Sequence, residues 1–144
     1  MCRGKKIIVF AYILALLGCG AIKKGDSSSG TSCPNEETPS GTVQSQGTFS
    51  GVNNQTVSGI ARIYISSGTF VLRIESITFP QETGLQLVAQ TSTGATNSLS
   101  VKCMSGNQNY PLSAEAGSVW SSITLKSITK NMDYGTATLT AVSD

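Results

Sequence analysis

From Val57 to Phe79 the chain reads VSGIARIYISSGTFVLRIESITF, and this stretch decides the fold class. Apolar and polar residues alternate on both sides of a central Ser-Ser-Gly, as they do when every second side chain of a strand faces a core. Glycine accepts a positive φ at little cost, so residues 66–68 are expected to form a hairpin turn. The stretch predicts two paired antiparallel strands, Val57 to Ser66 and Thr69 to Phe79.

The period of two also assigns the faces of the second strand. One face is expected to carry Phe70, Leu72, Ile74 and Ser76, and the other Val71, Arg73, Glu75 and Ile77.

Further strand-like segments flank this hairpin, and clusters of Gly, Ser, Asn and Pro separate them. They are Gln46 to Gly51, Leu85 to Gln90, Ser98 to Cys103, Trp120 to Thr129 and Gly135 to Val142. Strands recurring roughly every eight to twelve residues, without long helical periodicity, are typical of antiparallel sandwiches and barrels. We expect a single all-β domain over residues 42–144, an antiparallel β-sandwich or a barrel-like fold.

The N-terminal residues resemble the signal of a bacterial lipoprotein. Residues 1–6 carry three positive charges, and the apolar run over residues 7–17 is shorter than the roughly 20 residues that a membrane-spanning helix needs. Leu16-Leu17-Gly18-Cys19 then resembles a lipobox, with Leu17 where Ala or Ser is usual. The alternatives are an ordinary signal peptide and a short buried helix. We expect residues 1–18 to be a cleaved signal peptide and Cys19 to be lipidated.

Lipidation would determine where the protein resides. Acyl chains on Cys19, palmitate among them, would hold it on a membrane surface, since each buried CH₂ contributes roughly 0.8 kcal/mol. We therefore expect a lipid-anchored, extracytoplasmic protein whose membrane partner is lipid. Gly20 follows Cys19 where the sorting logic of lipoproteins would need Asp for retention in the inner membrane. In a bacterium with two membranes we expect the outer one.

Removal of the signal also changes the charge. It takes away three of the ten Lys and Arg residues and none of the eight Asp and Glu residues, which leaves a net charge of −1. No basic patch remains that would bind nucleic acid. Residues 19–41, which read CGAIKKGDSSSGTSCPNEETPSG, hold too little apolar surface to offset their ordering entropy. We expect them to form a disordered tether in which Glu36 and Glu37 are solvated.

Two of the four cysteines, Cys33 and Cys103, remain after removal of the signal and lipidation of Cys19. In an oxidising compartment two spare thiols usually pair, and this pair would close a loop of 70 residues. The alternative is a redox thiol or soft-metal ligand at Cys103, beside Met104. Neighbouring residues on a strand point to opposite faces, so a disulfide or an inert buried thiol is favoured.

Four stretches carry a resemblance to a known family. They are Gly47-Thr48-Phe49 with Gly51, VSGIARIY at 57–64 followed by VLRIE at 71–75, GNQNY at 106–110, and Tyr134-Gly135-Thr136-Ala137. In this order, over most of residues 47–142, they resemble the electron-transfer DM-thirteen domain. The resemblance implies a small all-β extracytoplasmic module with a proposed redox role.

The chain departs from the family pattern at two places. QETGL at 81–85 replaces a turn that contains Pro-Asp, and Ser127 stands near the position of the family's cysteine. A serine hydroxyl forms no disulfide and does not cycle as a thiol. The resemblance therefore implies the fold more strongly than the chemistry.

Most catalytic chemistry is excluded by composition. The chain has no histidine, which removes the usual zinc sites, Ser-His-Asp triads and His-ligated haem. It also lacks a CxxC motif and a Gly-rich phosphate loop, and its acids are too dispersed for a glycosidase pair or a calcium loop. We expect no enzyme activity, no metal and no cofactor.

Two further features have alternative interpretations. Asn107, Asn109 and Tyr110 could form a ligand-binding edge, but Asn-rich stretches before proline more often satisfy a turn. Trp120, the single tryptophan, is expected to anchor the core rather than a binding surface.

The sequence therefore predicts a non-enzymatic binding or accessory module of the cell envelope, whose partner is an envelope protein or a small ligand. The first alternative is a redox protein that uses Cys103. The second is a structural or adhesive surface lipoprotein.

Overall fold

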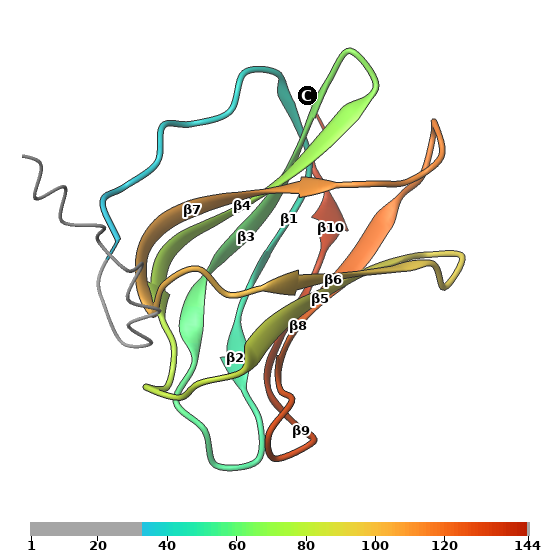
Figure 1. The fold of residues 1–144 in the computed structure, drawn as a ribbon. Coiled ribbons are helices and arrows are strands. Elements are labelled where there is room, and N and C mark those ends of the chain that lie inside the picture. Colours follow the sequence, from blue (N-terminus) through green and yellow to red (C-terminus); the bar gives the residue numbers. More distant parts are fainter. Residues whose placement is uncertain (1–32, 144) are drawn as a thin grey trace, which may run out of the picture.

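A computed structural model describes residues 33–143, and all regular secondary structure in this range is β-strand. The strands are β1 (Thr42–Thr48), β2 (Ser50–Gly51), β3 (Ser58–Ser66), β4 (Thr69–Thr78), β5 (Leu85–Thr91), β6 (Thr96–Ser100), β7 (Ser105–Leu112), β8 (Trp120–Ser127), β9 (Met132–Thr138) and β10 (Thr140–Ala141). Sheet A has the order β10-β1-β3-β4-β7 and sheet B the order β2-β9-β8-β5-β6. The two antiparallel sheets pack as a β-sandwich (Figure 1), which confirms the predicted fold class.

The predicted hairpin is formed by β3 and β4. The two strands pair from Ser66 opposite Thr69 to Ser58 opposite Thr78. Ser67 and Gly68 form the two-residue loop with φ values of 50° and 78°, the signs that a type I′ turn requires.

A bulge near the end of β4 changes the predicted faces of that strand. The pairing of β4 with β7 shifts register between Ile74 and Ile77, and Ser76 has a φ of 50°. The extra residue turns Ile77 into the core, where it is 4% exposed, and leaves Ser76 exposed. The prediction that Ile77 shares a face with Arg73 and Glu75 is therefore wrong.

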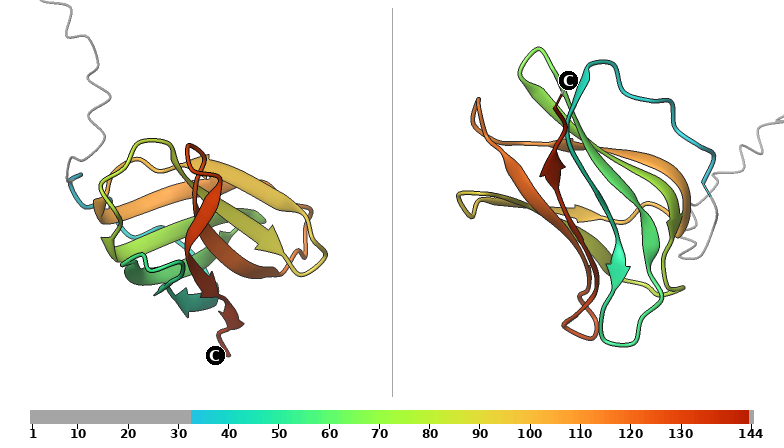
Figure 2. Two further views of the ribbon diagram at one scale, coloured as in Figure 1. Left: turned by 90° about the horizontal axis from the view of Figure 1, so that it is seen from below. Right: turned by 180° about the vertical axis from the view of Figure 1, so that it is seen from behind.

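At one edge of the sandwich the chain passes twice between the sheets (Figure 2). Phe49 separates β1 from β2, and Leu139 separates β9 from β10, so each predicted long strand is divided between the two sheets. Gly47 permits close approach at this edge, because a Cβ there would lie 2.1 Å from the carbonyl oxygen of Thr138. The two passages of the chain between the sheets, packed closely at Gly47, thus close this side of the core.

The core between the sheets is apolar and aromatic. Trp120 is 1% exposed and packs edge-on against Phe70, with ring centroids 6.0 Å apart. Phe49 and Phe79 form a second edge-to-face pair at 5.7 Å. Trp120 is therefore a core anchor, as predicted.

The segment between β6 and β8 differs most from the prediction. β6 ends at Ser100, so Cys103 and Met104 lie in the connection to β7, and both are buried. The prediction that they lie on a strand with opposite faces is wrong. The favoured turn at residues 107–110 is also wrong, because these residues belong to β7, the edge strand of sheet A. An edge position accommodates Pro111, whose nitrogen has no hydrogen to donate.

Candidate functional site

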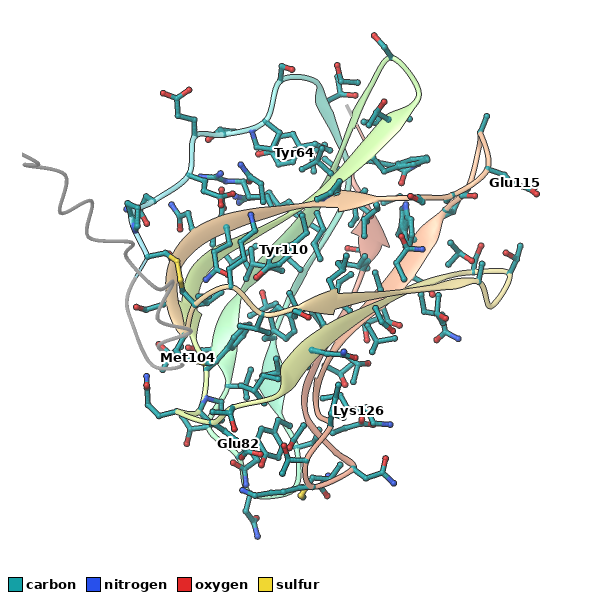
Figure 3. The ribbon with its side chains drawn as sticks, viewed as in Figure 1. Tyr64, Glu82, Met104, Tyr110, Glu115 and Lys126 are labelled. Carbon is teal, nitrogen blue, oxygen red and sulfur yellow. A yellow bond between two sulfur atoms is a disulfide. The ribbon has the colours of Figure 1, made fainter. Side chains whose placement is uncertain are left out.

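Residues 33–41, here called the strap, pack against sheet A before the chain enters β1. A disulfide between Cys33 and Cys103 fixes the start of the strap to the β6–β7 connection, with Cα atoms 5.7 Å apart (Figure 3). For these residues the predicted disordered tether is wrong, because their backbone and side chains bond to β4 and β7.

The strap covers the free edge of β7. The Asn107 N–H donates to Oδ1 of Asn35 at 2.8 Å, and the Asn107 carbonyl accepts from the Glu36 N–H at 2.9 Å. The Asn109 N–H donates to Oε2 of Glu36 at 2.6 Å, and the Asn109 carbonyl accepts from Nζ of Lys102 at 2.6 Å. Lys102 also pairs with Glu36 at 2.7 Å and lowers the pKa of that carboxyl. Glu36 therefore bonds to β7 and Lys102 through both carboxylate oxygens, which the prediction of a merely solvated side chain missed, although 35% of the side chain stays exposed. Glu37 is exposed, as predicted.

Arg73 joins the strap to the outer face of sheet A. Its side chain is 4% exposed, and Nη1 donates to the carbonyls of Glu36 (3.1 Å) and Glu37 (2.8 Å). The same nitrogen donates to Oδ1 of Asn109 at 3.0 Å, while Nε donates to Oε1 of Glu75 at 2.7 Å. A guanidinium holds its N–H donors in a rigid plane, so these hydrogen bonds fix the positions of β4, β7 and the strap relative to one another.

The residues considered for a ligand-binding edge have internal partners. Oδ1 of Asn107 accepts from the N–H of Ser76 and so caps the bulge in β4. Tyr110 is 3% exposed, and its hydroxyl bonds to Gln108 and to the N–H of Lys102. Burial raises the pKa of Tyr110 to about 12. With Asn109 bound to Arg73 and the strap, these groups maintain the fold instead of facing a ligand.

A shallow cleft opens beside the strands that cross between the sheets. Its volume is about 420 Å³, and it is lined by Gln46, Gly47, Thr48, Ile60, Arg62, Thr138 and Thr140. Arg62, on β3, connects its two neighbouring strands of sheet A, because Nε donates to Oε1 of Gln46 on β1 at 3.2 Å and Nη1 pairs with Glu75 on β4. Hydroxyl, amide and guanidinium groups make this a polar surface without an evident nucleophile or general base.

No protein-family model, curated protein or solved structure matches this chain. A further polar cluster surrounds Ser127, the residue that the DM-thirteen resemblance implies as the counterpart of a cysteine. Ser127 is fully buried at the end of β8, and its Oγ donates to Oε1 of Glu82 at 2.6 Å. Oε2 of Glu82 pairs with Nζ of Lys130 at 2.8 Å and accepts from the Tyr134 hydroxyl. Glu82 thus joins the β4–β5 loop to the β8–β9 turn.

These partners shift the pKa values of Glu82 and Lys130 in opposite directions. The bond with Lys130, followed by those with Ser127 and Tyr134, lowers the pKa of Glu82 from 4.5 to about 2. The same carboxylate raises the pKa of Lys130.

The replacement Glu82→Gln is expected to change the acid stability of the domain. Glu82 titrates near 4.5 when unfolded and near 2 when folded, so its stabilisation is present above about pH 4.5 and is lost as the pH falls toward 2. Urea denaturation between pH 7 and pH 2 should therefore show a steeper loss of stability in the wild type than in Glu82→Gln. The exposed Glu115→Gln is the matched control. Parallel pH profiles for wild type and Glu82→Gln would contradict the assignment.

Cys19 lies outside the described residues. Within residues 33–143, no three Cys, Asp or Glu side chains gather as metal ligands. That same range contains no helix with the length and apolar character needed to span a membrane.

Proposed function

We propose that the protein is a membrane-anchored bacterial lipoprotein whose β-sandwich is a non-enzymatic binding or accessory module of the cell envelope. The observation that carries the proposal is the disulfide between Cys33 and Cys103. Disulfides persist in oxidising compartments and are rare in the cytosol. A cross-linked domain behind the lipobox-like sequence at Cys19 supports an extracytoplasmic location.

The disulfide also limits how far the domain extends from the membrane. Residues 20–32 would form the spacer between the lipidated Cys19 and the first residue fixed to the domain. An extended spacer of this length reaches about 45 Å. The sandwich would therefore work close to the bilayer surface.

The replacement Cys19→Ser is expected to abolish lipid attachment. Cells fed an alkyne analogue of palmitate should label the wild-type protein, which should sediment with membranes. Cys19→Ser should lose the label and leave the membrane fraction, because acyl chains supply the affinity for the bilayer. Cys33→Ser is the matched control and should keep the label. Continued labelling of Cys19→Ser, or a wild type that stays out of the membrane fraction, would overturn the proposal.

The electron-transfer role implied by the DM-thirteen resemblance gains no support from this geometry. Cys103 is 8% exposed and bonded to Cys33, while the Ser127 hydroxyl is occupied by Glu82. A buried, paired sulfur is a poor redox participant, since reactive cysteines are accessible thiolates. A binding or accessory role is therefore favoured.

A further inference from the structure

The edge of β6 differs from the other sheet edges within residues 33–143. β2 and β10 contain two residues each, while β7 is covered by the strap and contains Pro111. β6 contains five residues and pairs with β5 on one side only. Unpaired edge strands are ready templates for another strand.

The register shows which backbone groups of β6 are free. Hydrogen bonds from Thr91 N to Ala95 O and from Val101 N to Leu85 O set the alternation of the β5–β6 ladder. By this alternation, Asn97 and Leu99 bond to β5. The N–H and C=O groups that point toward the open edge belong to Thr96, Ser98 and Ser100.

The chemistry of β6 leaves this edge open to pairing. Residues 91–101, TSTGATNSLSV, contain no charge and no proline, the usual devices that keep strand edges apart. Leu99 packs against the core, and Asn97 exchanges hydrogen bonds with the backbone of Ser113 at 2.7 and 2.9 Å. The strand is therefore held in place while its outer edge stays exposed.

We propose that β6 pairs antiparallel with β6 of a second copy of this chain. A twofold axis at Ser98 places Ser98 opposite its copy and Thr96 opposite Ser100, so that all outward groups meet a partner. Each facing pair would exchange two N–H···O=C bonds, as hydrogen-bonded antiparallel pairs do. The facing side chains are small hydroxyl residues without like charges, and the mature net charge of −1 adds little repulsion. An edge without charge offers no electrostatic complementarity to a charged partner strand, whereas two identical copies of it meet without repulsion, which favours a second copy.

Cysteine cross-linking in the full chain tests this register. Ser98→Cys should yield a dimer on a non-reducing gel, because facing Cα atoms of such a pair lie about 5.5 Å apart, within disulfide range. Thr124→Cys on β8, away from both edges of sheet B, is the matched control and should stay monomeric. The double variant Thr96→Cys/Ser100→Cys should cross-link far more than either single variant.

A charge at the axis provides the second test. Adding Ser98→Lys to the Thr96→Cys/Ser100→Cys chain should abolish its dimer, because two lysines would face each other. Equal cross-linking at positions 98 and 124, or dimers that persist with Ser98→Lys, would overturn the pairing. A cross-linked product of another mass would also overturn it and indicate a different occupant. None of these results depends on lipid attachment, which the Cys19→Ser experiment tests separately.

Discussion

Replacing Arg73 with Met should lower the free energy of unfolding by about 3 kcal/mol, the low end of the range for breaking a buried ion pair. The guanidinium is 4% exposed and bonds to Glu75, to Asn109 and to the strap carbonyls of Glu36 and Glu37. Methionine has a similar length but no donors, so these acceptors would lose their partner in a place that water reaches poorly. Urea denaturation at neutral pH measures the difference.

Arg62→Met is the matched control for this prediction. Arg62 pairs with the same carboxylate, Glu75, but its side chain is 29% exposed. Exposed ion pairs contribute at most about 1 kcal/mol, so Arg62→Met should cost far less than Arg73→Met. Equal losses for the two variants would show that the strap contacts of Arg73 add nothing to stability.

The second large effect is expected from removal of the disulfide. The double variant Cys33→Ser/Cys103→Ser opens a loop of 70 residues, and in the chain-entropy model this costs about 4 kcal/mol. The strap should detach from β7 before the rest of the domain unfolds, because its contacts with that strand are polar and partly exposed. Hydrogen exchange at the Asn107 and Asn109 amides, which donate to strap residues, should accelerate in the variant.

Reductant supplies the control for the disulfide. Reduced wild type should unfold at the urea concentration of the double variant, whereas the double variant should be insensitive to reductant. A wild type whose midpoint does not change on full reduction would contradict a stabilising role for the Cys33–Cys103 bond.

Local patterns of the sequence predicted the parts of the fold that depend on local geometry. The alternation from Val57 to Phe79 predicted the β3–β4 hairpin, and the Ser-Gly turn supplies the two positive φ values. Burial of Trp120 followed from the size of its ring. The all-β class followed from recurring strands, which need no knowledge of distant contacts.

The features that the sequence did not predict depend on contacts between distant residues. The bulge that turns Ile77 inward is capped by Asn107, which lies 31 residues after Ser76. β7 lacks a run of β-branched residues, because its polar edge binds the strap and its Asn107 caps the bulge. Nothing in the strand itself distinguishes that role from a turn.

The polar clusters were also missed, although one signal was present. Arg73 stands between Leu72 and Ile74 within an apolar strand, and a charge in that setting needs partners. The sequence could not show that those partners include backbone carbonyls of Glu36 and Glu37. Glu82 gave no signal, since it is one acid in a polar loop and its partners lie more than 40 residues later.

The position of the disulfide determines how mechanical tension would reach the domain. In a chain held by Cys19, a pull from the membrane arrives at Cys33 and passes through the sulfur bridge to Cys103. Cys103 lies between β6 and β7, so the load divides between an edge strand of each sheet. The hydrogen bonds of residues 34–41 lie outside this path. A strap held only by polar contacts would peel from the sheet under force, whereas this one is shielded by a covalent bond placed ahead of it.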